Sequence, residues 1–217
     1  MNATPSLAEL ARQITRGGAE EMRKRILAEP PAIDLAPTRG DFELNPGIRE
    51  QAVSPLTPSA VLVPIVRHPD PTLLLTRRTD HLSRHAGQVA FPGGRASEDD
   101  TSLIATALRE TEEEIGIRSD LVTVAGFLET YETGTGYAIL PVVGFLEEGF
   151  TVVPDVNEVA EVFEVPLAFL LDPANRERER VFWQDRWREF YAFRYGSHYI
   201  WGATAAMLVN FLDKLRA

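Results

Sequence analysis

Two hydrophobic periodicities divide the chain into strand-like and helix-like segments. Residues 60–66 and 73–76 are short apolar runs separated by the turn formers Pro69-Asp70-Pro71, a pattern that predicts two β-strands. Further strand-like runs lie at residues 121–130, 137–147, 159–165, 180–184 and 188–194. Apolar residues at helical spacing occur in residues 6–28, 101–116 and 202–216. Strands mixed with helices predict a layered α/β or α+β domain.

The first quarter of the chain differs from the rest in its pattern of residues. The helical pattern of residues 6–28 is interrupted at Gly17-Gly18, and residues 29–58 are rich in proline and turn formers. We therefore expect residues 1–57 to be a helical arm and Pro-rich linker packed on a main domain of residues 58–217. The longest apolar runs are far shorter than the ~20 residues of a membrane-spanning helix. We expect a cytoplasmic protein with no membrane partner.

The segment 101–116 predicts the clearest helix. Residues 99–102 offer several N-cap candidates, and Gly116 stands where a left-handed C-terminal residue belongs. One stripe of the helix is suited to the core and consists of Ile104, Leu108, Thr111 and Ile115. Glu110, Glu113 and Glu114 are spaced i, i+3 and i+4, so their carboxylates converge on a different face.

These glutamates are unfavourable for the helix itself. Like charges at i,i+4 repel, and anions at a helix C-terminus oppose the macrodipole by ~0.3–1 kcal/mol each. A divalent cation would reverse both penalties, and carboxylate oxygens are the ligands that Mg²⁺ prefers. The alternative is a solvated acidic face on which Arg109 pairs with Glu112 and Glu113.

Charge and composition narrow the classes of function. The 217 residues carry a net charge of −10 and contain no cysteine, which excludes disulfides, thiol nucleophiles and cysteine-ligated metal sites. The acidic balance argues against a nucleic-acid partner. The charge is unevenly distributed, because residues 95–116 have a net charge of −5 and residues 77–94 of +2. An anionic small substrate could therefore meet a metal where these segments adjoin.

The acidic helix resembles the Nudix box, G-x5-E-x7-R-E-U-x-E-E-x-G-U with U apolar. The matching positions are Gly94, Arg109, Glu110, Glu113, Glu114, Gly116 and Ile117. Thr111 stands at an apolar position, and the distance from Gly94 to Arg109 is one residue longer than in the box. The first glutamate of the box falls on Asp100 or Thr101, depending on the end from which it is counted, and Glu98, Asp99 or Asp100 could replace it.

This resemblance implies a Nudix α/β/α sandwich with a mixed central sheet and hydrolysis of a phosphoanhydride bond in a nucleoside diphosphate derivative. It implies that Mg²⁺ or Mn²⁺ is bound by Glu110, Glu113 and Glu114, with a backbone carbonyl near Gly94. Glu110 and Glu113 would be catalytic, and Arg109 would orient the glutamates. Many members take a further glutamate from outside the box. Glu158 is our candidate for a fourth ligand or general base, and Glu161 is the alternative.

A second pattern, in residues 74–94, resembles the coenzyme A diphosphatase branch of this family, L-L-T-x-R-[SA]-x3-R-x3-G-x3-F-P-G-G. The matches are Leu74, Leu75, Thr76, Arg78, Gly87 and residues 91–94, whereas Ser83 stands at the second arginine position and is followed by Arg84. The resemblance implies cleavage of coenzyme A (CoA) or its acyl derivatives to 3′,5′-ADP and 4′-phosphopantetheine. The predicted substrate-binding residues are Arg77, Arg78, Arg84, His85 and Gly93.

Two alternatives remain open at the level of the sequence. The chain could hydrolyse another nucleotide, such as ADP-ribose, a dinucleotide or a damaged nucleoside triphosphate, because Ser83 replaces an arginine of the CoA pattern. It could also be a non-catalytic nucleotide-binding module, although the complete set of glutamates argues against this. The sequence leaves a homodimer open.

Overall fold

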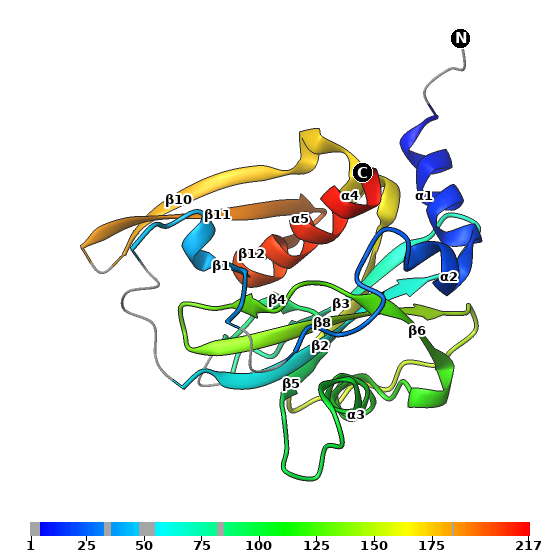
Figure 1. Cartoon of the computed structure of the whole chain (residues 1–217), viewed down its shortest axis with the longest axis horizontal. Helices are drawn as coiled ribbons and strands as arrows, with labels where there is room; N and C mark the ends of the chain where they lie inside the picture. Colours follow the sequence, from blue (N-terminus) through cyan, green and yellow to red (C-terminus); the bar gives the residue numbers. More distant parts are fainter. Residues whose placement is uncertain (1–4, 33–35, 48–54, 82–84, 184) are drawn as a thin grey trace.

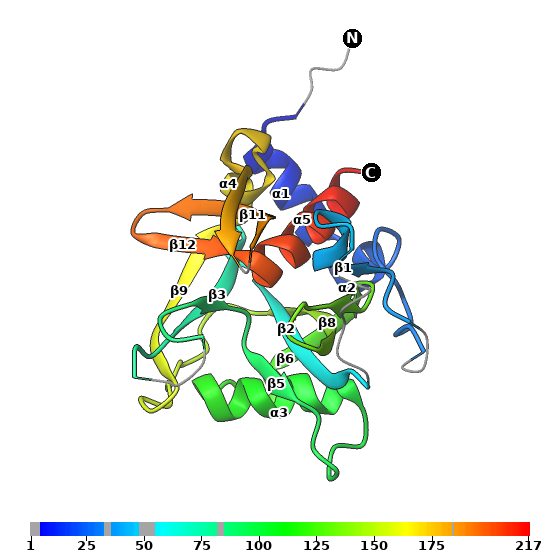
Figure 2. The same ribbon diagram turned by 90° about the vertical axis from the view of Figure 1, so that its left-hand side faces the viewer.

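Helices cover both faces of a mixed β-sheet, with α3 on one face and α5 on the other (Figures 1 and 2). The computed structural model describes residues 5–32, 36–47, 55–81, 85–183 and 185–217. The helices are α1 (Leu7–Arg16), α2 (Gly18–Met22), α3 (Leu103–Ile115), α4 (Leu167–Leu171) and α5 (Gly202–Arg216), with short 3-10 turns η1 (Asp41–Glu43), η3 (Ser119–Leu121) and η4 (Pro173–Asn175). The strands are β1 (Arg39–Gly40), β2 (Thr57–Val66), β3 (Thr72–Arg78), β4 (Val89–Ala90), β5 (Gly93–Arg95), β6 (Val122–Phe127), β7 (Tyr131–Glu132), β8 (Tyr137–Leu146), β9 (Val159–Pro166), β10 (Glu177–Trp183), β11 (Arg186–Tyr195) and β12 (His198–Trp201).

The larger sheet, which has nine strands in the described residues, is organised around β2 and β8. These strands pair in parallel over ten residues, from Thr57↔Tyr137 to Val66↔Leu146. Most of the other pairings are antiparallel, so the sheet is mixed. The second edge of β2 is shared, because residues 59–61 pair with β5 and residues 65–66 pair with β3. Both partner strands contact α3, because Gly93 of β5 and Arg78 of β3 lie next to Glu114.

The alternation along β2 explains the layers. Val63 and Ile65 belong to the large core between the sheet and α5, whereas Ala60 and Leu62 pack with Ala107 of α3. Successive residues of a strand point to opposite faces, so one apolar run supplies both cores. The mixed sheet with helices on both faces confirms the predicted fold class.

The N-terminal segment contacts the sheet at several points. The helical pattern is interrupted at Gly17, which lies between α1 and α2, as the sequence predicts, and Gly18 begins α2. Ile14 and Met22 are buried in the large core. β1 pairs with β7, and Leu27 forms a β-bridge with Phe127. The division of the chain at residues 57 and 58 stays a prediction. No helix in the described ranges is long and apolar enough to cross a membrane.

The strands β10, β11 and β12 form a second, smaller sheet, of which the sequence patterns predict only the first two strands. The β10–β11 hairpin extends beyond the main sheet (Figure 1). At its end Trp183 and Trp187 are more than half exposed. Only Trp201 is partly buried, against Phe190 and Tyr199.

Candidate active site

Local signals fix the start and the end of α3, and they place the glutamates in its last two turns. The Ser102 Oγ accepts a hydrogen bond from the Ala105 N–H (3.2 Å), which caps the first turn. Gly116 ends the helix with a φ of +73°, where a side chain would be strained, and its N–H donates to the Glu112 carbonyl. The helix therefore begins and ends where the sequence predicts.

The Gly93-Gly94 strand lies directly against two of these carboxylates. The Gly93 N–H donates to Glu114 Oε2 (3.2 Å). A Cβ atom at Gly94 would lie 2.4 Å from Glu110 Oε2 and 2.5 Å from its Cδ, closer than real contacts allow. A side chain at position 94 would therefore displace the Glu110 carboxylate from its present position.

Burial makes the glutamate cluster electrostatically unusual. Glu114 is only 5% exposed, and burial raises its pKa to about 8. The Gly93 N–H and Arg78 oppose this rise, while the charges of Glu110 and Glu158 add to it. Burial also raises the pKa of Glu110, and Glu113 and Glu158 add to the rise, while Arg109 lowers it. The cluster therefore has more negative charge than its neighbouring cations offset.

Arg109 links the glutamates to the preceding loop. Its Nη1 contacts Glu110 Oε1 (2.9 Å) and Glu113 Oε2 (2.8 Å). Its Nε and Nη2 both donate to Asp100 (2.9 Å each), and Nη2 also donates to the Arg95 carbonyl (3.2 Å). The side chain thus holds the helix, the loop and β5 in one arrangement.

Asp100 is the acid that meets Arg109. Its side chain is buried, it accepts hydrogen bonds from the Ser97 N–H and the Thr106 hydroxyl, and the Arg109 guanidinium holds its pKa well below the usual range. The sequence leaves Glu98, Asp99 and Asp100 open as substitutes for the first glutamate of the box, and the contacts favour Asp100.

Of the two further glutamates, only Glu158 is close enough to influence the cluster. Its charge raises the pKa of both Glu110 and Glu114, and its backbone carbonyl accepts a hydrogen bond from the Thr79 N–H (2.9 Å). Glu161 instead contacts Arg77 Nε (3.5 Å) and His198 Nε2 (3.1 Å).

The predicted substrate-binding residues do not form one patch. Arg78 Nη1 lies 3.6 Å from Glu114 Oε1, whereas Arg77 pairs with Glu161 and with Asp80. His85 Nδ1 lies 2.9 Å from Gln88 Oε1. Arg84 lies outside the described residues. Arg78 and Gly93 are therefore the predicted substrate residues that contact the glutamate cluster.

The cluster fits a hard divalent cation by the chemistry of its donors. Glu110, Glu113 and Glu114 offer only carboxylate oxygens, and Gly94 leaves space that a Cβ atom would fill. Two of these carboxylates are at least partly buried and have a raised pKa, a condition that a cation would relieve. Among the side chains that the structure describes, no three His, Asp or Glu groups converge on one position suited to a metal ion.

Comparison with known proteins identifies the family to which the chain is similar. Residues 56–187 match the NUDIX domain. A protein called "Uncharacterized Nudix hydrolase NudL" from Yersinia enterocolitica is 46% identical over 155 residues, which are 69% of this chain and 77% of the relative. The protein of the same name from Pectobacterium atrosepticum is 44% identical over 176 residues, which are 79% and 88% of the two chains.

Solved structures are more distant. The MutT protein from Methanosarcina mazei is 25% identical, with a TM-score of 0.44 over 55% of this chain and 84% of that chain. The NUDIX domain of Shewanella oneidensis NrtR, solved in complex with ADP ribose, is 19% identical, with a TM-score of 0.42 over 60% and 84% of the two chains.

The carboxylates of Glu110 and Glu114 contact the Gly93-Gly94 strand, and this region lies within the part of the chain that matches the NUDIX domain. The chain belongs to the Nudix hydrolase family, as the match over residues 56–187 and the two relatives show. It is a hydrolase of nucleoside diphosphate derivatives, in a family that generally uses divalent ions such as Mg²⁺ or Mn²⁺.

Proposed function

We propose that the chain hydrolyses the diphosphate of CoA or its acyl derivatives to 3′,5′-ADP and (acyl-)4′-phosphopantetheine. The observation that carries the proposal is the contact of Gly93 and Gly94 with the carboxylates of Glu114 and Glu110. These glycines end the segment 74–94, whose sequence resembles the CoA diphosphatase pattern. The CoA-type motif and the carboxylate cluster therefore meet at one place.

Glu110, Glu113 and Glu114, with the Gly94 carbonyl, would hold Mg²⁺ or Mn²⁺. When bound, the ion neutralises the diphosphate and lowers the pKa of an attacking water. Without a cation the carboxylates would repel the anionic substrate, because Arg78 and Arg109 offset only part of their charge.

The remaining residues position groups and move a proton. Arg109 orients Glu110 and Glu113, and its bidentate contact with Asp100 fixes its own position. Arg78 carries a buried Nε without a hydrogen-bond partner, next to Glu114, and we assign it to a diphosphate oxygen. Glu158, which is exposed immediately before β9, would accept a proton from the attacking water as general base.

The substrate is tested with a panel. The protein is incubated with Mg²⁺ and CoA, acetyl-CoA, ADP-ribose, NADH or deoxynucleoside triphosphates, and the products are separated by chromatography. We expect CoA to yield 3′,5′-ADP and 4′-phosphopantetheine in equal amounts. Consumption of ADP-ribose with CoA left intact would overturn the choice of substrate, and no turnover of any compound would favour a non-catalytic module.

The cytoplasmic location and the homodimer stay predictions.

A further inference from the structure

Arg95 directly follows Gly93 and Gly94, which contact the carboxylates of Glu114 and Glu110. It ends β5, opposite Ser59 of β2 in the antiparallel register. The Gly94 position faces Glu110, so strand alternation directs the Arg95 side chain to the other face of β5. The Arg95 carbonyl accepts a hydrogen bond from Arg109 (3.2 Å), which ties its backbone to the glutamate cluster.

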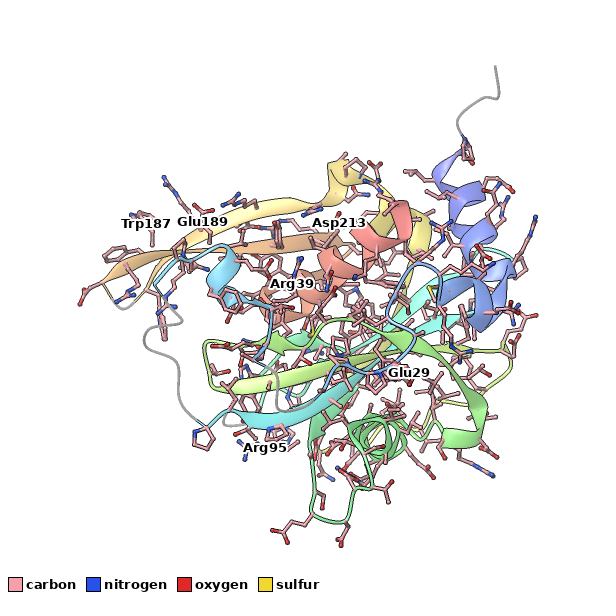
Figure 3. All side chains as sticks on the ribbon, viewed as in Figure 1. Glu29, Arg39, Arg95, Trp187, Glu189 and Asp213 are labelled. Atoms are coloured by element: carbon pink, nitrogen blue, oxygen red, sulfur yellow. The ribbon has the colours of Figure 1, made fainter. Side chains whose placement is uncertain are left out.

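The Arg95 side chain is held by an aromatic residue. Its Nε donates to the Tyr137 hydroxyl (3.1 Å), its Nη2 donates to the same oxygen, and its Cζ lies 5.2 Å from the ring centroid. A guanidinium has five N–H donors, so most of them stay available. The residue is exposed and lies at the rim of the molecule beside β2 and α3 (Figure 3).

Arg95 differs from the other arginines of the site in its charge balance. Arg77, Arg78 and Arg109 each form an ion pair with at least one carboxylate. No carboxylate of the described part of the chain lies within ion-pair distance of Arg95. Its charge is therefore available to an anion from solution.

A buried hydroxyl adjoins this arginine. Ser59 is 5% exposed, and its Oγ has no hydrogen-bond partner among the described atoms. Residues opposite each other in an antiparallel pair have Cβ atoms about 4.5–5.5 Å apart. A buried polar group without a partner is costly, and it points to a ligand or a water that the protein is built to receive.

We infer that Arg95, held by Tyr137 and adjoined by Ser59, forms a subsite for a phosphate monoester of the substrate outside the hydrolysed diphosphate. The inference rests on the proposed function, in which that group is the 3′-phosphate of CoA. One ribose separates this phosphate from the diphosphate, and Arg95 directly follows Gly94, which contacts Glu110. A planar guanidinium with free donors suits phosphate oxygens.

The test compares Arg95→Gln with Arg95→Lys, Tyr137→Phe and the control Arg118→Gln. Arg118 is also exposed, but it follows the C-terminal end of α3 and pairs with Asp120. KM and kcat are measured with CoA and with dephospho-CoA, which lacks the 3′-phosphate. Thermal unfolding of each variant checks that it is folded.

We expect Arg95→Gln to raise KM for CoA about tenfold or more and to leave KM for dephospho-CoA within twofold, because only CoA loses a charge-assisted contact. Arg95→Lys and Tyr137→Phe should shift KM for CoA less, in the same direction, and Arg118→Gln should shift neither. An unchanged ratio of the two KM values in Arg95→Gln would overturn the inference while the proposed function stands.

Binding of product fragments distinguishes a failure of the proposed function from a failure of the subsite inference. If the wild-type protein does not hydrolyse CoA, the proposed function fails, and calorimetry with 3′,5′-ADP and with AMP still tests the subsite. Tighter binding of 3′,5′-ADP than of AMP, lost in Arg95→Gln, would support it. Equal affinities for the two nucleotides in the wild-type protein would overturn it.

Discussion

The helices α3 and α5 cover opposite faces of one sheet, but the charged residues near their C-terminal ends differ in sign. α5 carries Lys214 and Arg216 in its last turn, where cations complement the macrodipole, and it has no acidic residue in its first turn. α3 has no basic residue in its last turn, ends in three consecutive glutamates and buries one of them, Glu114. α5 thus follows the charge preference of the helix macrodipole, whereas α3 departs from it at some cost in stability.

This difference supports the proposal that the active site lies at the C-terminal end of α3. Natural sequences depart from local rules mainly at functional sites. The departures in α3 lie next to Gly93 and Gly94, the two glycines that contact its carboxylates. The contrast predicts that equivalent disruptions of the two helices have different consequences. A disruption of α3 should lower activity without unfolding the protein. A disruption of α5 should lower stability without a specific loss of activity.

The largest effect is expected from the glutamates of α3. Glu110→Gln and Glu113→Gln should each lower kcat by about 10²–10⁴-fold, because each removes a carboxylate from the proposed metal site. The thermal unfolding temperature should stay close to that of the wild type. The matched control is Glu112→Gln, since Glu112 is exposed on the same helix and does not share the cluster. Near wild-type kcat in either cluster variant would remove that residue from the site.

The corresponding disruption of α5 is Leu208→Ala. Leu208 is fully buried in the large core, so its truncation should lower the free energy of unfolding by about 2–5 kcal/mol. Urea denaturation measures this loss, and kcat per folded molecule should stay as in the wild type. Leu121→Ala, at a half-exposed position, should cost much less. A fall in kcat without loss of stability in Leu208→Ala would break the comparison.

Gly94→Ala tests how closely the strand and the helix must approach. The added Cβ would meet the Glu110 carboxylate, the flexible end of a side chain, so the carboxylate and not the backbone should move. We expect kcat to fall about 10–100-fold, as for displaced groups around a metal site, with little change in the unfolding temperature. Unchanged kcat would show that the contact is dispensable, and a parallel collapse of stability would show that it is structural.

The smallest effect concerns Asp100 and acid pH. Because Arg109 holds the Asp100 pKa below its usual value of 3.8, the ionised pair contributes stability above that pH, and this contribution is lost as the pH falls further. Asp100→Asn should lower the free energy of unfolding by about 1 kcal/mol at neutral pH and make the acid decline shallower. Denaturation curves between pH 2 and 7 measure both. Parallel declines in the two proteins would contradict the assignment.

Much of the scaffold follows from local sequence signals. The bounds of α3 follow from Ser102 and Gly116, whose capping depends on neighbouring residues alone. The apolar runs of β2 and β8 predict buried strands, because each run serves the cores on both faces of the sheet. The convergence of Glu110 and Glu114 follows from helical spacing, but their burial beneath Gly93 and Gly94 depends on the tertiary contact.

Other features depend on contacts between distant segments. β3 continues two residues beyond the predicted strand, so Arg77 and Arg78 lie in a strand rather than in a loop. Consecutive strand residues project to opposite faces, and Arg77 meets Glu161 while Arg78 meets Glu114. β12 is absent from the sequence patterns because it is short and is stabilised by pairing with β11.

The central claim is that the glutamates of α3 break the rules of helix charge because they bind a divalent cation. Calorimetric titration of Mg²⁺ and Mn²⁺ into the wild-type protein, Glu110→Gln, Glu114→Gln and Glu112→Gln tests it without reference to any substrate. We predict binding to the wild type and to Glu112→Gln, and at least tenfold weaker binding to the two cluster variants. Equal affinity of all four proteins for the ions, or no binding to any, would contradict the claim.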